Sequence, residues 1–115
     1  MSSHLELVHK HINGSPIRAE AEGIRIALAV TDDGVIAGRS GFLGRWGSKV
    51  EYFELQDLVA LRTVPNPSAN LMILEFEGTP RRTLTVMYGP QGQADFERIV
   101  DLLEARLAAR QGGGK

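Results

Sequence analysis

The sequence of 115 residues predicts a mainly β (α+β) domain: about seven short antiparallel strands followed by one long amphipathic helix. Apolar and polar residues alternate with a period of two at 24–31 and again at 82–88, which is typical of half-buried strands. Turns that contain glycine or proline lie between most of the expected strands. After Gly89 and Pro90 the apolar spacing changes to that of a helix.

A short N-terminal helix and a turn are predicted for residues 1–14. Leu5, Val8 and Ile12 lie at positions i, i+3 and i+7, which form one face of a helix. The Asn-Gly-Ser-Pro sequence at 13–16 then supplies a helix stop and a turn. The segment thus precedes the β domain, which we expect to span residues 15–109.

A β-hairpin is predicted around the Asp-Asp-Gly sequence at 32–34. It follows the alternating strand at 24–31 and precedes the apolar residues 35–37. Aspartate and glycine tolerate the positive φ angles that tight hairpin turns require. A first strand is expected just before this hairpin, at 17–22, although the alternation there is poor.

Four further strands are expected to follow. They are the segments 49–53, 58–64, 71–77 and 82–88. The residues between the second and third contain Pro65 and Pro67, which cannot donate to a strand ladder and therefore indicate a loop. Consecutive strands joined by short turns have to pair antiparallel.

The closing helix is predicted from about Gly92 to Ala109, with residues 110–115 as a disordered tail. Its apolar positions are Phe96, Ile99, Val100, Leu103 and Leu107. Their spacing places them on one face. A single apolar face needs a sheet face or an open barrel mouth to cover.

Composition excludes several classes of function. With 13 basic and 14 acidic residues the formal net charge is −1, and nucleic-acid binders usually carry a basic surplus, so we expect no nucleic-acid partner. The chain has no cysteine, which excludes disulfides, thiolate metal sites and cysteine nucleophiles and fits a cytoplasmic protein. We expect no secretory leader, because the N-terminus lacks a basic region followed by an apolar one. We expect no membrane-spanning segment, because no apolar run approaches the ~18 residues that a membrane helix needs.

Three segments carry a resemblance to a known family. They are the strand and turn at 27–36 (Ala-Leu-Ala-Val-Thr-Asp-Asp-Gly-Val-Ile), the connector at 53–59 (Phe-Glu-Leu-Gln-Asp-Leu-Val) and the helix at 96–103. In this order they resemble the bacterial PH-like (pleckstrin-homology-like) domains often described as YokE-like. The connector matches in outline only, because the family's Pro-Tyr pair is absent from it.

The resemblance covers residues 15–108 and implies a PH-like barrel. In that fold seven antiparallel strands form two near-orthogonal sheets, and a C-terminal helix plugs one end. The resemblance also implies a domain that binds rather than catalyses and that can self-associate, since bacterial PH-like domains can form rings.

The candidate binding site is the glycine-rich segment Gly38–Lys49, which has four glycines in twelve residues. Its cationic and large aromatic side chains are Arg39, Phe42, Arg45, Trp46 and Lys49. In eukaryotic PH domains a basic loop between early strands binds phosphoinositide headgroups. Here the loop follows the third predicted strand and lacks a Lys-x-Arg pair. The loop is therefore expected to be solvated, to contact a protein, or to bind anionic lipid.

No catalytic group, metal site or cofactor is expected. The histidines lack the thiol or paired carboxylates that would complete a metal site, so we expect them to face solvent. They are His4, His9 and His11. The glycines at 41–47 do not have the spacing of a phosphate-binding loop. The acidic pair at 32–33 and the arginine pair at 81–82 are expected in solvated turns, and no serine has a neighbouring histidine or acid that would mark a nucleophile.

The first functional hypothesis is therefore a non-catalytic interaction module, acting by protein–protein contact or by self-association as a homo-oligomer. Strand addition at an exposed sheet edge is one mode that it could use. The second hypothesis is peripheral binding to anionic lipid headgroups through Gly38–Lys49. A third, an enzyme or a carrier of a small apolar ligand, is disfavoured because the closing helix is expected to fill the barrel mouth.

Overall fold

A computed structural model describes residues 3–12, 14–39, 49–66, 68, 71–79 and 82–113. In chain order the elements are α1 (Ser3–Lys10), β1 (Ala19–Gly23), β2 (Ile26–Val30), β3 (Gly34–Arg39), β4 (Lys49–Glu54), η1 (Leu55–Asp57), β5 (Leu58–Asn66), β6 (Leu71–Gly78), β7 (Arg82–Tyr88), η2 (Pro90–Gly92) and α2 (Gln93–Gly113). The seven antiparallel strands, the short first helix and the C-terminal helix confirm the predicted mainly β class.

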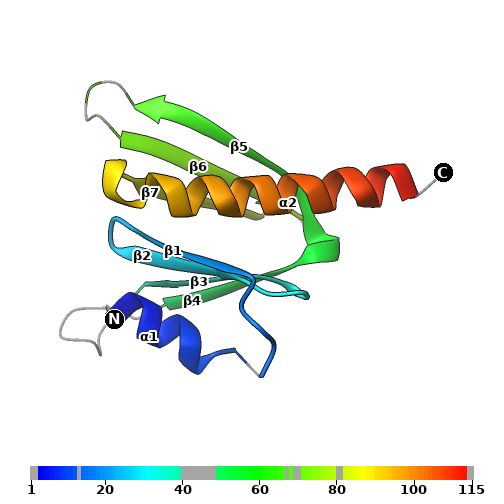
Figure 1. The fold of residues 1–115 in the computed structure, drawn as a ribbon, viewed down its shortest axis with the longest axis horizontal. Helices are drawn as coiled ribbons and strands as arrows, with labels where there is room; N and C mark the ends of the chain where they lie inside the picture. Colours follow the sequence, from blue (N-terminus) through cyan, green and yellow to red (C-terminus); the bar gives the residue numbers. More distant parts are fainter. Residues whose placement is uncertain are drawn as a thin grey trace.

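The strands form two separate antiparallel sheets, β1-β2-β3-β4 and β5-β6-β7. In Figure 1, α2 runs through the space between the two sheets, while α1 lies on the far side of the four-stranded sheet. Between β1 and β7 no strand ladder forms in the described residues. A single backbone hydrogen bond, from the Ile24 N–H to the Met87 carbonyl at 2.8 Å, joins the β1–β2 turn to β7. The predicted closed barrel is therefore wrong, because the two sheets stay open toward each other.

The main core lies between the sheets and beneath α2. Phe53 of β4 and Phe76 of β6 stack with ring centroids 6.4 Å apart, which joins the two sheets. Tyr88 of β7 and Phe96 of α2 stack at 4.3 Å with an interplanar angle of 11°. The predicted helical stripe supplies the rest, since Ile99, Leu103 and Leu107 of α2 are also buried.

The two central strands of the four-stranded sheet, β2 and β3, are buried on both faces except at Arg39, which corrects the prediction of a half-buried strand at 24–31. Small side chains explain the difference, because Ala27 and Ala29 on the outer face let α1 approach and bury Val8 against them. Gly38 also allows α1 to pack closely, because a Cβ at this position would lie 2.7 Å from Cγ2 of Val8. The small side chains on the outer face of β2 therefore lie under α1 and not in solvent.

The turns differ from the predictions in detail. The hairpin around 32–34 is confirmed, with Val30 paired to Val35. However, the φ angle of Gly34 is not positive. A glycine is required at this position for a different reason, because an added Cβ would collide with the carbonyl oxygen of Phe53. The strand predicted from 24 begins at Ile26, because residues 24–25 form a tight turn in which Arg25 has a φ of 59°.

The C-terminal helix is longer than predicted. It continues past Ala109 to Gly113, so most of the predicted tail at 110–115 belongs to α2. Phe96 and Tyr88 anchor its first turn against β7, and Leu107 is its last buried side chain in the described part of the chain.

Replacing Arg25 by glycine should stabilise the protein by about 0.5–1 kcal/mol, because glycine adopts φ values near 59° without the steric cost that a Cβ carries. Urea unfolding at neutral pH measures this change. Arg25→Ala is the matched control, since it removes the same side chain but keeps the Cβ. Equal midpoints for the two variants would show that the backbone conformation contributes no strain.

Candidate functional site

Two of the five predicted binding residues lie within the described structure, and they face each other. Arg39 ends β3 and Lys49 begins β4, and the two residues are paired across the antiparallel ladder. Phe42, Arg45 and Trp46 lie outside the described residues. The structure therefore shows the two cations at the base of the Gly38–Lys49 segment, one on each strand.

These cations lie on the core-facing side of the four-stranded sheet. Residues paired across an antiparallel ladder share a face, and that face recurs every second residue. The pairs Val35–Phe53, Ala37–Glu51 and Arg39–Lys49 therefore form one continuous row. Val35 and Phe53 are fully buried, whereas Arg39 and Lys49 at the end of the same row are exposed. Closing the two sheets over this end would bury charged side chains at a large free-energy cost, which explains why the barrel stays open there.

A cleft of about 260 Å³ occupies this open end. On one side it is bounded by the row just described and by β2, and on the other by β7. Its lining residues are Ile26, Ala37, Arg39, Lys49, Glu51, Thr83, Leu84 and Thr85. The cleft therefore brings the two predicted cations against the middle of a strand that is distant in the sequence.

The edge of β7 that borders the cleft is free of any strand partner among the described residues, because β7 is the last strand of its sheet and pairs only with β6. The Met87 carbonyl points away from β6, since it accepts the hydrogen bond from Ile24. Backbone direction alternates along a strand, so the N–H and C=O groups of Thr85 and Thr83 point the same way. These groups can form strand hydrogen bonds with an incoming chain.

The charge at the cleft is positive. The ammonium of Lys49 lies 3.0 Å from the carboxylate of Glu51, but the Lys49 side chain remains 68% exposed. Arg39 has no ion-pair partner in the described part of the chain. Two cations and one carboxylate leave a net charge of +1, so the cleft favours an anionic group.

Arg82, at the start of β7, is not a solvated turn residue as predicted. Its guanidinium lies 4.2 Å from the centre of the Phe53 ring, and it donates a hydrogen bond of 3.0 Å to the carbonyl of Tyr52. Arg82 therefore ties β7 to β4. Its neighbour Arg81 lies outside the described residues.

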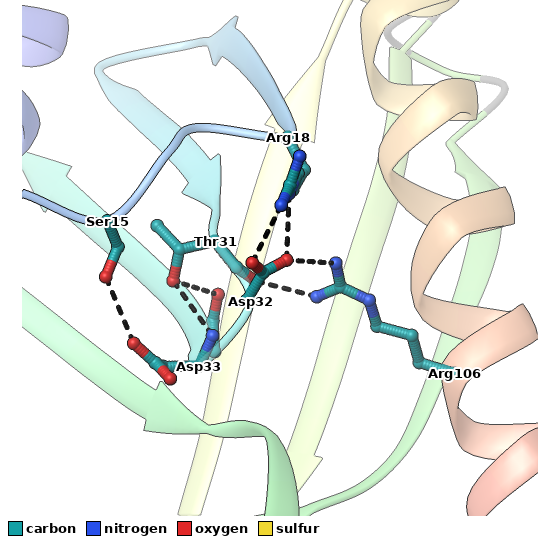
Figure 2. Close-up of polar contacts among 7 residues, drawn as sticks. Ser15, Arg18, Thr31, Asp32, Asp33 and Arg106 are labelled. Carbon is teal, nitrogen blue, oxygen red and sulfur yellow. Dashed lines mark hydrogen bonds and ion pairs between the residues drawn. The ribbon is translucent and has the colours of Figure 1, made fainter.

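A second polar cluster surrounds the hairpin between β2 and β3 (Figure 2). Arg18 donates two hydrogen bonds of 2.8 Å to the carboxylate of Asp32. Arg106 of α2 donates to the Thr31 carbonyl at 2.6 Å and approaches Asp32 at 3.5 Å. Hydrogen bonding to Arg18, together with the positive charges of both arginines, lowers the pKa of Asp32. This cluster ties α2 and the segment before β1 to the hairpin, a structural task rather than a catalytic one.

Replacing Asp32 by asparagine should lower stability at neutral pH but not in acid. The pKa of Asp32 is lowered in the folded state, so its contribution is present above the unfolded value of about 4 and is lost as the pH falls through the folded value. Urea midpoints of the variant and the parent should differ at pH 7 and converge below pH 4. Asp101→Asn, the same change on the exposed face of α2, is the control. A difference that persists undiminished into acid would contradict this role.

His9 and His11, at the C-terminal end of α1, each contact a neighbouring group. The Nε2 of His9 lies 2.7 Å from the carboxylate of Glu20, and Nδ1 of His11 lies 2.9 Å from the Leu7 carbonyl. Across the described ranges, histidine, aspartate and glutamate nowhere gather in a group of three that could hold a metal ion. In the same part of the chain no helix is both long and apolar enough to cross a membrane.

Comparison with models of known protein families, with curated proteins and with solved structures returns no match for this chain.

Proposed function

We propose that the chain is a non-catalytic, cytoplasmic interaction module of PH-like architecture that binds an extended acidic segment of a protein partner. The observation that carries this proposal is the cleft in which Arg39 and Lys49 face the free edge of β7. Sheets of four and three antiparallel strands followed by a C-terminal helix support the PH-like architecture, with the open end serving as the binding site.

Binding proceeds by strand addition. The partner's backbone pairs with the outward N–H and C=O groups of Thr83 and Thr85, which provides affinity that does not depend on sequence. Side chains alternate along the added strand, so every second one points toward the four-stranded sheet. An acidic residue at those positions meets Arg39 or Lys49, which provides specificity.

A titration followed by ¹⁵N-labelled NMR tests this proposal. The probe is the peptide acetyl-Thr-Glu-Val-Glu-Thr-amide, which has two glutamates on one face of a strand. We expect it to shift the amide signals of Thr83, Thr85 and Arg39 at low salt, and to shift them less as salt screens the charges. The isosteric peptide with glutamine in place of both glutamates should bind at least 10-fold more weakly.

Equal binding of the two peptides, or shifts that map outside the cleft, would contradict the proposal. Sedimentation velocity on the free protein separates the two partner types. A dimer or larger ring that dissociates when the acidic peptide is added would identify a second copy of the chain as the occupant of the same edge.

Lipid binding is the second candidate, because cations flank both ends of the Gly38–Lys49 segment. Anionic phosphatidylserine vesicles, compared with neutral phosphatidylcholine vesicles, test it by co-sedimentation. Salt-sensitive pelleting with the anionic vesicles alone would support a headgroup site. Absence of the protein from both pellets at low salt would remove this candidate.

A further inference from the structure

A second cavity, of about 330 Å³, lies on the outer face of the four-stranded sheet. It is bounded by the C-terminal end of α1, the segment that leads to β1, and strands β3 and β4. Its lining residues are His11, Ile12, Ser15, Thr31, Asp33, Ile36, Val50 and Tyr52. Because Ile36 pairs with Tyr52 on the face opposite the core row, this cavity is separated from the β7 cleft by the sheet itself.

The floor of the cavity is apolar. Ile36 is buried, and Val50 and Ile12 pack against the same small cluster beneath α1. The volume is at the lower end of the range for small-ligand pockets, which suits an apolar body of about the size of one ring.

A carboxylate that has no ion-pair partner among the described residues borders this floor. Asp32 and Asp33 are adjacent in the sequence, but only Asp32 is neutralised by arginines. Asp33 turns the other way (Figure 2) and accepts one hydrogen bond, of 3.1 Å, from the Ser15 hydroxyl. No lysine or arginine of the described chain contacts it. An ionised carboxylate has about four acceptor positions, so most of those on Asp33 remain available to a ligand.

The Tyr52 hydroxyl is a further polar group of the cavity. Its pKa is raised by burial and by the negative charges of Asp33 and Glu54, so its hydroxyl stays protonated and can hydrogen-bond to a ligand. His11, also in the lining, has its Nδ1 2.9 Å from the Leu7 carbonyl. The cavity therefore places the carboxylate of Asp33 beside an apolar floor.

We propose that this cavity binds a small organic ammonium ion, with the charged nitrogen on Asp33 and the apolar body against Ile36 and Val50. A charge-assisted hydrogen bond to the carboxylate orients the ligand, and burial of the apolar body supplies most of the affinity. The same chemistry is offered by a free amine and by the side chain of a lysine in a partner protein.

NMR titration of the ¹⁵N-labelled protein with 2-phenylethylammonium chloride tests the inference. We expect shifts at residues 31–36 and 50–52 that leave Thr83 and Thr85 unmoved. The neutral isostere 2-phenylethanol should bind at least 10-fold more weakly. Asp33→Asn should remove this preference for the cation, and Asp101→Asn, the same change on α2, should keep it. The folded spectrum of each variant confirms that its structure is intact.

Equal affinity for the amine and the alcohol, or the absence of shifts around the cavity with either, would overturn the proposal. N-acetyl-lysine methylamide serves as a third probe. If it binds more tightly than 2-phenylethylammonium, the ligand is assigned to a protein lysine, and if it binds more weakly, to a free amine.

Discussion

Replacing Phe53 by alanine should lower the free energy of unfolding by about 3–5 kcal/mol, as expected for a buried phenylalanine whose cavity cannot collapse. The Phe53 ring stacks on Phe76 across the two sheets and carries the guanidinium of Arg82 on its face. It also fills the space at Gly78, where an added Cβ would lie 2.7 Å from the ring. Because domains of this size have only about 5–15 kcal/mol of stability, the loss would be a large share of the total.

Urea unfolding followed by circular dichroism measures this loss. Val59→Ala on β5 is the control, since that side chain is 45% exposed and its truncation should change stability by no more than about 0.5 kcal/mol. Losses of equal size in the two variants would contradict the role of Phe53 as the residue that joins the sheets.

Reversing both cations of the cleft should abolish binding of the acidic peptide. In the variant with Arg39→Glu and Lys49→Glu, Glu51 and the two new carboxylates would repel each glutamate of the peptide. We expect the affinity for acetyl-Thr-Glu-Val-Glu-Thr-amide to fall at least 100-fold, because each of the two sites changes from attraction to repulsion. Isothermal titration calorimetry or the NMR titration measures the change.

Arg62→Glu is the matched control for charge. Arg62 is an exposed cation of β5 that pairs with Glu75 and does not line the cleft. Its reversal changes the net charge of the protein without changing the cleft, so binding should stay within about twofold. The loss of peptide affinity per reversed cation is then compared between the two variants. If it is equal, the overall charge of the protein and not the cleft drives association.

Periodicity predicted the elements of this fold because it reports local burial. The alternation at 82–88 and the helical stripe from Phe96 to Leu107 both correspond to core-facing residues. It could not distinguish a strand covered on one face from one covered on two. The alanines of β2 are compatible with either exposure or close helix packing, and only the position of α1 decides between them.

The candidate sites depend on contacts between distant residues, which no local pattern reports. Arg18 and Asp32 are separated by 14 positions, and Arg106 is a further 74 positions along the chain. The sequence predicted Arg39 and Lys49 as binding residues, but not their position against β7. That placement follows from how the two sheets pack, which puts Arg39 and Lys49 in one cleft with Thr83 and Thr85 of β7.

The backbone of β7 offers the most direct test of the proposed function. Amide hydrogen exchange at Thr83 and Thr85 should slow by at least 10-fold when acetyl-Thr-Glu-Val-Glu-Thr-amide saturates the protein, because each amide would then donate to the added strand. The amide of Leu84, which points toward β6, should change far less and serves as the internal reference. If Thr83 and Thr85 exchange at the same rate with and without bound peptide, the peptide does not pair with this edge, and strand addition at β7 is excluded.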